Sequence, residues 1–388
     1  MWKILILNND LELGGIQKSL IEFVTYLVHS NEFSVDLMLW QKNGPLQKML
    51  PAEVNIIFKN YPATANDILT AKKPLQKLTL LYPFFKSLYC NRILGKPWIF
   101  YPKVPTHYDI AVSFTHNGFP RFFSIDRVSA NQKFLWFHHG SYHGSVREKD
   151  LDNQYYRQFD RIVTVSEANK SMLSSVFPDL RQRLAVVPNI INFGEIILKA
   201  NETISDMPQN PNEYRFVTVS RFSPEKGLDL ALEIASLLNQ KGLTFRWYFV
   251  GDGPQYSEIQ QLAQDKGVAE ECVFVGSKEN PYAYIKNADL YIQSSYVEAH
   301  PITINEALTL KKMIVSTDIA SIREILNNGK LGMLCKPEAE IFADAIFELL
   351  KNELKQRNLK NAVEEYNFTN EAAYEAINNV LNIRIQEK

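Results

Sequence analysis

Apolar runs typical of β-strands alternate with segments of helical periodicity along almost the whole chain. This alternation predicts parallel sheets covered by helices on both of their faces. In the first half, a helix is expected over residues 14–29, because its apolar side chains recur on one face. The strands expected there are residues 3–7, 35–40, 110–114, 134–137, 162–165 and 185–187.

The alternation breaks once, in a segment that ends SDMPQNPNEY and has prolines and asparagines but no regular period. With 388 residues, the chain is long for one α/β domain and natural for two. We therefore expect an N-terminal domain over residues 1–192, a linker over 193–213 and a C-terminal domain over 214–368. The cleft between two such doubly wound domains is the expected ligand site. The strands expected in the second domain are residues 215–220, 245–250, 272–275, 290–293 and 313–316, with helices over 228–240 and 255–266.

The composition argues against several classes of protein. A net charge of −1 creates no global field that would attract nucleic acid. The opening residues MWKILILNND have an apolar run too short for a signal peptide, and no stretch approaches the ~18 apolar residues of a membrane span. Any membrane contact is therefore expected to be peripheral. Cys90, Cys272 and Cys335 form no metal-binding spacing, which indicates reduced thiols in a cytoplasmic protein.

Residues 59–103 differ from the rest of the first half in charge and aromatic content. They contain eight Lys or Arg residues and a single acid, Asp67, interleaved with leucines and aromatic residues. A basic stretch with aromatics suits an anionic membrane surface, which would place the protein peripherally at the inner membrane face. The alternative is a helical insertion that packs its apolar side on the domain and leaves its lysines in solvent.

Arg221 and Lys226, in the stretch SRFSPEKG, stand five residues apart between an expected strand and an expected helix. Strand ends in a doubly wound sheet open into the ligand crevice, and a helix start adds partial positive charge. Two cations there suit a diphosphate, since an arginine can bind two oxygens at once. The alternative is a surface arginine and lysine beside a turn.

Two glycine turns between a strand and a helix can bring backbone N–H groups close to a ligand. Gly14 and Gly15 open the first helix, and FVGDGPQ at residues 249–255 has a similar order. No third glycine follows Gly15 at the spacing of a dinucleotide fingerprint, which argues against a dinucleotide oxidoreductase. Taken alone, each turn is also compatible with an ordinary tight connection.

The stretch SSYVEAHPITINEAL keeps two carboxylates, Glu298 and Glu306, eight positions apart around Pro301. Pro301 suits the first turn of a helix, so the N–H groups of Ile302 and Thr303 are expected to be unpaired and to face the cleft. A carboxylate accepts hydrogen bonds from paired sugar hydroxyls. One glutamate can then bind a ribose and the other a second sugar, with phosphate at the helix start between them. The alternative is two solvated acids.

The order of these motifs resembles that of the family-4 glycosyltransferases, retaining enzymes also described as group 1 glycosyl transferases. The resemblance covers nearly the whole chain and is strongest over residues 160–318. It implies the GT-B fold, an α/β architecture of two doubly wound, Rossmann-like domains facing across a cleft, with residues 369–388 forming a helix that crosses back to the first domain. The matching pieces are GGIQKSL, FDRIVTVSEANK, VPNIIN, SRFSPEKG, FVGDGP, VFVGSKEN, YIKNADLYIQSS and the E-x7-E pair.

The resemblance also implies roles for the residues that match its motifs. Arg221 and Lys226 would hold the diphosphate of a nucleotide sugar, Glu306 would bind the ribose hydroxyls, and Glu298 would contact the transferred sugar. The main chain at Gly14, Gly15, Ile302 and Thr303 would approach the phosphates, and that near Lys278 would meet the base. His138, in LWFHHG, matches a histidine that lines the donor-sugar or acceptor pocket, and His139 and His116 are the other candidates for this role.

The implied activity is retaining transfer of a hexosyl or N-acetylhexosaminyl group from a nucleotide sugar to a hydroxyl of a glycan or lipid-linked acceptor, in cell-surface polysaccharide biosynthesis. UDP is the expected leaving group and GDP the alternative, with no cofactor and no metal. A nucleotide-sugar epimerase on the same fold and a non-catalytic scaffold are the other hypotheses. Ala299 and His300 replace the usual glycine and aromatic residue, and PNIIN lacks a usual glycine, so the donor sugar stays open.

Overall fold

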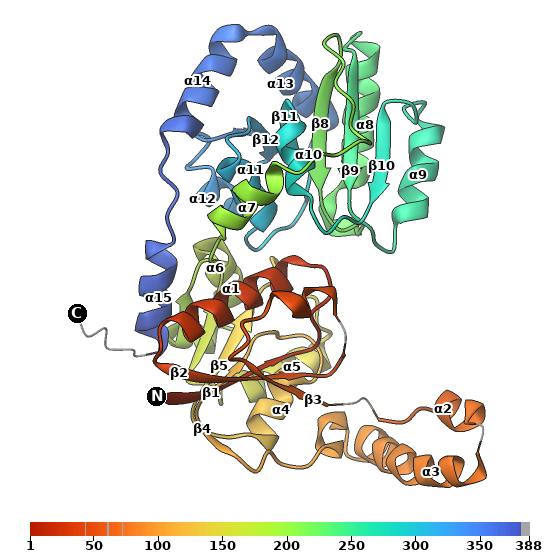
Figure 1. The fold of residues 1–388 in the computed structure, drawn as a ribbon, viewed down its shortest axis with the longest axis vertical. Coiled ribbons are helices and arrows are strands. Elements are labelled where there is room, and N and C mark those ends of the chain that lie inside the picture. Colours follow the sequence, from red (N-terminus) through yellow and green to blue (C-terminus); the bar gives the residue numbers. More distant parts are fainter. Residues whose placement is uncertain (43, 60–61, 72, 382–388) are drawn as a thin grey trace.

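The computed structural model describes residues 1–42, 44–59, 62–71 and 73–381, which form two parallel sheets flanked by helices (Figure 1). The sheet of the first half lies in the lower part of Figure 1 and the sheet of the second half above it. The two-sheet α/β architecture predicted from the alternation is confirmed.

Seven strands form the N-terminal sheet, in the order β3-β2-β1-β4-β5-β6-β7. Its central pair, β1 and β4, aligns Ile4 with Ile110 and Ile6 with Val112, all of them buried. Continuous apolar runs of this kind suit a parallel sheet that is covered on both faces. The strands are β1 Trp2–Asn8, β2 Phe33–Leu39, β3 Asn55–Phe58, β4 His107–Ser113, β5 Ser129–Phe137, β6 Arg161–Thr164 and β7 Leu184–Val186. The helices of this half, apart from the insertion described below, are α1 Gly15–His29, η1 Pro45–Met49, α4 Pro120–Arg127, α5 Val146–Tyr156, α6 Glu167–Val176 and η4 Pro178–Arg183.

Six strands form the C-terminal sheet, in the order β10-β9-β8-β11-β12-β13. Trp247 on β9 is fully buried, and its Nε1 donates to Thr218 Oγ1 on the neighbouring strand β8. The strands are β8 Tyr214–Val219, β9 Phe245–Val250, β10 Cys272–Gly276, β11 Leu290–Gln293, β12 Ile314–Thr317 and β13 Met333–Cys335. The helices are η5 Pro224–Lys226, α8 Leu228–Gln240, α9 Tyr256–Asp265, α10 Tyr282–Asn287, α11 Ile302–Thr309, α12 Ala320–Ile325, α13 Ala339–Lys351 and α14 Glu353–Glu365.

The segment expected to be an irregular linker, residues 193–213, begins with a helix, α7 Phe193–Ala200. Asn192 caps this helix, because its side-chain oxygen accepts from the N–H of Glu195. Ile196 and Ala200 then pack against Tyr282 of α10. The prediction of irregular structure was therefore wrong for residues 193–200. There, an N-cap and two apolar contacts stabilise a helix although the sequence has no regular period.

The last described helix, α15 Glu371–Leu381, lies beside the N-terminal sheet although it follows the C-terminal one in sequence (Figure 1). Its buried residues Ala373, Ile377 and Leu381 belong to the core around β1 and β4. Just before it, the side-chain amide of Asn370 both accepts from the N–H of Ile191 and donates to its carbonyl, each at 2.9 Å. The chain passes between the two domains twice, once after Ile191 and once before Asn370. These two chain crossings are thus hydrogen-bonded to one another.

An insertion between β3 and β4 projects away from the N-terminal sheet (Figure 1). It comprises α2 Ala65–Thr70, α3 Pro74–Leu88, the single π-turn η2 Tyr89–Ile93 and η3 Pro97–Phe100. No residue of α2 or α3 is buried. On α3, however, one apolar side is half-buried, with Leu80, Leu81, Phe84 and Leu88. The alternative of an insertion that packs its apolar side on the domain is therefore met only in part.

Candidate active site

The loops that follow β1 and β11 meet between the two sheets (Figure 1). A Cβ atom on Gly15, at the start of α1, would lie 3.9 Å from Cδ1 of Ile302, at the start of α11. Two helix N-termini therefore approach one another from opposite domains. Each presents unpaired N–H groups and a partial positive charge, which is the environment that a phosphate requires.

The loop after β8 carries both predicted cations. Gly227 closes this loop in the left-handed conformation (φ 59°), and a Cβ there would overlap the carbonyl oxygen of Ser294. Only glycine therefore allows the loop to pack on the end of β11. From this loop Lys226 reaches Glu298, with Nζ 2.8 Å from Oε1, while the side chain of Arg221 is exposed.

Glu298 accepts three hydrogen bonds on a single oxygen. Its Oε1 accepts from Lys226 Nζ, from Gln293 Nε2 at 3.0 Å and from Ser295 Oγ at 2.8 Å. The side chain of Glu298 is only 8% exposed, so these donors rather than solvent balance its charge. In the described part of the chain none of the three donors uses Oε2, which is left for a further donor.

Glu306 is more deeply buried, with its side chain 1% exposed. Its Oε1 is 2.7 Å from Nζ of Lys18, which belongs to helix α1 of the other domain. Within the described residues Glu306 Oε2 has no hydrogen-bond partner, although it is buried. The expectation of two solvated acids is therefore wrong for both glutamates, and Oε2 of Glu306 lacks a donor.

Lys18 is a site residue that the sequence did not reveal. Burial alone would lower its pKa, but the charge of Glu306 and hydrogen bonds with Glu306 and Tyr282 raise the pKa above its ordinary value. Its Nζ also lies 4.8 Å from the centre of the Tyr282 ring. Lys18 stands three residues after the glycine pair, and its position in GGIQKSL was the only available signal.

Helix α11 begins close to the residue at which the sequence predicted its start. The helix begins at Ile302, with Pro301 as its N-cap, and the N–H of Ile304 is the one that bonds to the carbonyl of Pro301. Ile302 and Thr303 therefore hold the first N–H groups of the helix, which have no acceptor within it. Pro301 thus lies one position before the helix rather than in its first turn.

The structure separates the candidate histidines. The ring of His138 packs on Phe114 with centroids 4.8 Å apart, its Nε2 is buried without a partner among the described residues, and burial lowers its pKa to about 3. The pKa of His139 is also lowered, mainly by burial, but the charges of Glu225 and Lys226 act on it. His139 is therefore the histidine that lies close to the cation loop.

The histidine loop also packs directly on Glu298. A Cβ on Gly140 would lie 2.5 Å from the carbonyl carbon of Glu298, so only glycine permits this approach. The ring of His139 is oriented by Asn117, whose Nδ2 donates to Nε2 at 3.0 Å. His139 and Gly140 together bring the N-terminal domain against the loop that carries the first glutamate.

Two further hydrogen-bonded contacts join the domains beside the site. Ser166 Oγ donates to the carbonyl of Ala299 at 2.7 Å. The carboxylate of Glu324, on α12, accepts from the N–H groups of Glu167 and Ala168 at 3.1 and 2.6 Å. Helix α6 of one domain is therefore capped by a side chain of the other.

His300, which replaces an aromatic residue of the related motif, is hydrogen-bonded to Asn189, shortly before the first chain crossing. Asn189 accepts from Ser19 Oγ at 2.7 Å and donates through Nδ2 to Nδ1 of His300 at 3.2 Å. Nδ1 must be unprotonated to accept this bond, and burial lowers the pKa of His300 to about 4. Asn189 belongs to the stretch PNIIN, so both departures from the family pattern meet in one network.

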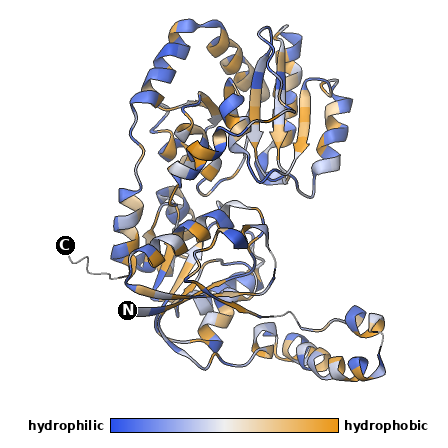
Figure 2. Cartoon of the chain, viewed as in Figure 1, coloured by the Kyte–Doolittle hydropathy of each residue, from blue (hydrophilic) through white to orange (hydrophobic). Residues whose placement is uncertain are grey.

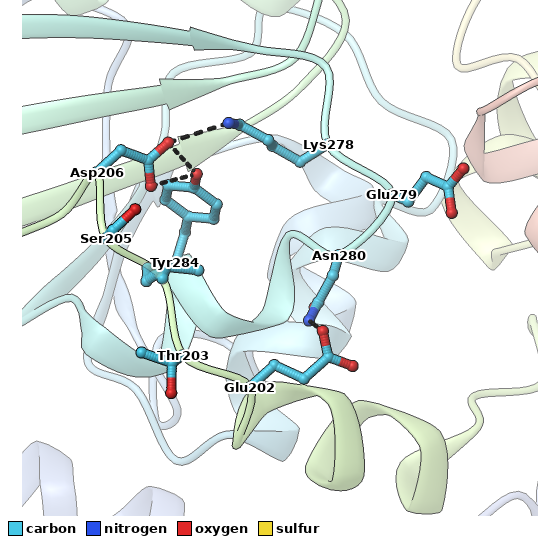
Figure 3. A pocket seen from close by; sticks show the side chains of 9 residues that line it. Glu202, Thr203, Ser205, Asp206, Lys278, Glu279, Asn280 and Tyr284 are labelled. Atoms are coloured by element: carbon cyan, nitrogen blue, oxygen red, sulfur yellow. Dashed lines mark hydrogen bonds and ion pairs between the residues drawn. The ribbon is translucent and has the colours of Figure 1, made fainter.

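Lys278, predicted to lie near the base, is held by the linker. Its Nζ is 3.0 Å from Oδ2 of Asp206, which also accepts from the hydroxyl of Tyr284 (Figure 3). These three residues line a pocket, together with Asn280 and Glu202, whose side chains are bonded to each other. The neighbouring Glu279 pairs with Lys48 of the N-terminal domain at 2.7 Å, so this pocket lies where the domains meet.

Three further properties hold over residues 1–42, 44–59, 62–71 and 73–381. No group of three or more His, Cys, Asp or Glu side chains is placed to hold a metal ion there. No helix within those ranges is long and apolar enough to cross a bilayer. The three cysteines are free and buried.

Comparison with known proteins identifies the class to which this arrangement belongs. Residues 200–366 match the family described as glycosyl transferases group 1. The chain also superimposes on the structure of HepE from Anabaena, solved with UDP and glucose, with a TM-score of 0.72, 15% identity and coverage of 99% of this chain and 100% of that one. Residues 200–366 are therefore similar to a group 1 glycosyl transferase domain, and the chain has the GT-B fold that the sequence predicted.

Sequence relatives are distant. An uncharacterised glycosyltransferase of Methanocaldococcus jannaschii is 24% identical over 62% of this chain and 69% of its own length. A poly(ribitol-phosphate) alpha-N-acetylglucosaminyltransferase of Staphylococcus aureus is 23% identical over 64% of this chain and 50% of its own. Membership of family 4, within this class, stays a prediction.

Proposed function

We propose that the protein is a retaining glycosyltransferase that moves a sugar from a UDP-sugar to a hydroxyl of a glycan or lipid-linked acceptor. The observation that carries the proposal is the carboxylate of Glu306. It is buried, its Oε2 has no partner in the described residues, and it lies on the helix whose N-terminus faces Gly15. A buried acceptor of this kind needs donors, and the paired hydroxyls of a ribose supply them.

The positive groups around the start of α11 suit the diphosphate of the donor. Arg221 is exposed and available to a ligand, and Lys226 is held nearby through Glu298. The first N–H groups of α11, at Ile302 and Thr303, and those of α1, at Gly14 and Gly15, add partial positive charge without side chains. These groups can take the role that a divalent cation has elsewhere, so we propose that no metal is required.

Glu298 is assigned to the transferred sugar. Its Oε1 is fixed by three donors, so a sugar hydroxyl would find Oε2 in a defined position. Ala299 and His300 follow it, and His300 is bonded to Asn189. We therefore propose that the loop of residues 298–300, which Asn189 holds in position, selects the sugar.

The proposed mechanism is attack on the face from which the diphosphate leaves. The bond from the anomeric carbon to the phosphate oxygen breaks, the acceptor oxygen bonds to the same face, and the departing phosphate takes the acceptor proton. The reacting state resembles an oxocarbenium ion paired with an anion, so the main task is to stabilise that anion. Arg221, Lys226 and the start of α11 are placed to do so, each donor contributing on the order of 2–4 kcal/mol.

The donor and the pathway are supported by the relatives. HepE was solved with UDP and glucose, and a structure of TarM from S. aureus was solved with UDP and alpha-GlcNAc-glycerol. The S. aureus relative is named as a poly(ribitol-phosphate) alpha-N-acetylglucosaminyltransferase. A hexose or an N-acetylhexosamine is therefore the proposed group, and cell-surface polysaccharide the proposed product. The three free cysteines fit the reducing environment of the cytoplasm.

The test is donor binding and slow donor hydrolysis with UDP- and GDP-linked hexoses and N-acetylhexosamines, with and without chelator. We expect one UDP-sugar to bind equally well in both conditions, to release UDP rather than an epimerised nucleotide sugar, and to lose binding in Glu306→Ala. Lys266→Ala, which breaks an ion pair between the end of α9 and Glu233 on α8 in the same domain, is the matched control and should bind normally. A folded protein that binds none of these donors would contradict the proposal.

The histidine assignment is tested in the same assay. His139→Ala is expected to lower transfer by about 100-fold, the scale of a lost polar contact in such a site, since His139 lies near Lys226. His138→Ala, by contrast, should mainly lower stability, because its ring packs in the core on Phe114. Normal transfer in His139→Ala together with loss of transfer in a stable His138→Ala would restore the original assignment to His138.

A further inference from the structure

The insertion between β3 and β4 exposes apolar side chains that no other described element covers. Five of them, on α3 and the turn that follows, recur at spacings of three and four residues and therefore lie along one side of the helix. Each is more than half exposed. They are Leu75, Leu78, Tyr82, Phe85 and Tyr89.

The exposed surface is wider than this stripe. Leu69 on α2 and Ile93 and Leu94 after α3 are also exposed, and Figure 2 shows apolar residues along the projecting helix. A contiguous apolar surface of this kind on a folded protein marks a place where something else binds.

The charge on the insertion is predominantly positive. The described residues from 62 to 103 carry six basic side chains and one acid, Asp67. The carboxylate of Asp67 is already engaged, because it accepts from the N–H and the hydroxyl of Thr64. The basic residues are Lys73, Lys77, Lys86, Arg92, Lys96 and Lys103.

The base of the insertion is fixed to the domain. Trp98 is buried and its Nε1 donates to Asp126 Oδ2 at 2.7 Å. Arg127 donates to the carbonyl of Ile99 at 2.7 Å, and Cys90 is buried. The helix is therefore presented on a fixed support rather than on a loose loop.

We infer that α2, α3 and η2 dock on an anionic lipid bilayer, with the apolar stripe in the headgroup boundary and the basic residues on lipid phosphates. Two observations favour a bilayer over a second copy of this chain. The excess of positive charge would repel an identical surface, and the exposed residues on α2 and after η2 extend the surface beyond the narrow stripe of a paired helix. The inference does not depend on which sugar is transferred. A bilayer bound at the insertion would also bring a lipid-linked acceptor close to the protein.

The test is flotation of the full chain with vesicles of 70% phosphatidylcholine and 30% phosphatidylglycerol, compared with pure phosphatidylcholine. We expect binding to the anionic vesicles that weakens as salt is raised. Leu78→Glu/Phe85→Glu should reduce this binding by about tenfold or more, because two apolar side chains no longer enter the boundary. Lys73→Glu/Lys77→Glu should reduce it as well, and its effect should vanish at high salt.

Leu354→Glu, on α14, is the matched control, since Leu354 is 65% exposed and Leu78 is 64% exposed. It should bind vesicles as the unaltered chain does. Equal binding of Leu78→Glu/Phe85→Glu and the unaltered chain would overturn the inference, as would no binding to anionic vesicles. A concentration-dependent dimer that the same double substitution dissociates would also overturn it, because a second copy would then cover the stripe.

Discussion

The interdomain cleft and the projecting insertion treat polar and apolar groups in opposite ways. In the cleft, two buried glutamates are paired with lysines, in the pairs Lys18–Glu306 and Lys226–Glu298. In the insertion, apolar groups are exposed, and no residue of α2 or α3 is buried. Both arrangements depart from the usual rule that apolar groups lie inside and charges outside.

The contrast shows where the chain serves a ligand rather than its own stability. Removing charges from water is unfavourable, and replacing a buried ion pair by apolar groups is often neutral or stabilising. An exposed apolar stripe likewise adds nothing to the stability of the isolated fold. The two regions therefore fit the ligands that we propose for them: a charged, polar molecule in the cleft and a lipid bilayer at the insertion.

The largest expected effect is on transfer, from Lys226→Ala. This substitution removes a cation from the diphosphate and leaves Glu298 without its ion-pair partner. We expect the rate of transfer to fall on the order of 100–1000-fold. Lys266→Ala, which removes a lysine paired with Glu233 at 3.2 Å on the same domain, should leave the rate unchanged. A normal rate in Lys226→Ala would remove this lysine from the site.

The next effect is on stability, from Lys18→Met, which leaves a buried carboxylate unpaired. We expect the free energy of unfolding to fall by about 3–5 kcal/mol. The double substitution Lys18→Met/Glu306→Gln should recover most of that loss but not donor binding, because the carboxylate is gone. Urea unfolding and donor titration measure the two quantities.

Lys48→Met provides the control for burial. Lys48 and Glu279 also join the two domains, with the same separation of 2.7 Å, but they are 65% and 63% exposed. Its substitution should cause no measurable change in unfolding. Equal losses in Lys18→Met and Lys48→Met would mean that burial is not what distinguishes the cleft.

A smaller effect is expected on the pH dependence of stability. Burial lowers the pKa of His300 to about 4 from an ordinary value of 6.5. The unfolded chain therefore takes up the proton first, so stability is full above pH 6.5 and is lost as the pH falls from 6.5 towards 4. His300→Gln should flatten part of this loss, and His29→Gln, at an exposed position, should not. An unchanged profile in His300→Gln would contradict the assignment, and the profile is read from thermal unfolding at each pH.

The smallest effect on stability is expected in the insertion. Leu78→Glu should change the free energy of unfolding by no more than about 0.5 kcal/mol, since Leu78 lies on a helix with no buried residue. Transfer to a soluble acceptor should also be unchanged. A large loss of stability would show that the stripe is covered within the chain, and the contrast with the cleft would fail.

Much of the fold follows from patterns that are local in sequence. The helix expected over residues 228–240 and the strands over 245–250 and 290–293 coincide with α8, β9 and β11. Buried parallel strands are continuous apolar runs, so they are visible without knowledge of their neighbours. The edge strands β3 and β13 were not predicted, because they are short and only partly buried and so lack such a run.

The sequence predicted which loops carry the candidate site residues, but it did not predict all of the ion pairs between them. Lys226 lies beside Glu298, and Glu306 lies on the helix that begins at Ile302, as the order of motifs indicated. The partner of Glu306 was missed, because Lys18 lies 288 residues away in the sequence. The choice between His138 and His139 was open for the same reason, since adjacent residues at a strand end point to different surroundings.

The sequence by itself determined the class of fold, the two sheets and the loops that carry the charged groups. These depend on the periodicity of apolar residues and on glycine, proline and charge at loop positions, all of which act over a few residues. Only the tertiary structure decided that both glutamates are buried, that Lys18 reaches one of them, and that one apolar side of α3 is exposed. Burial and pairing depend on which surfaces meet across the two domains, and that is a property of the folded chain.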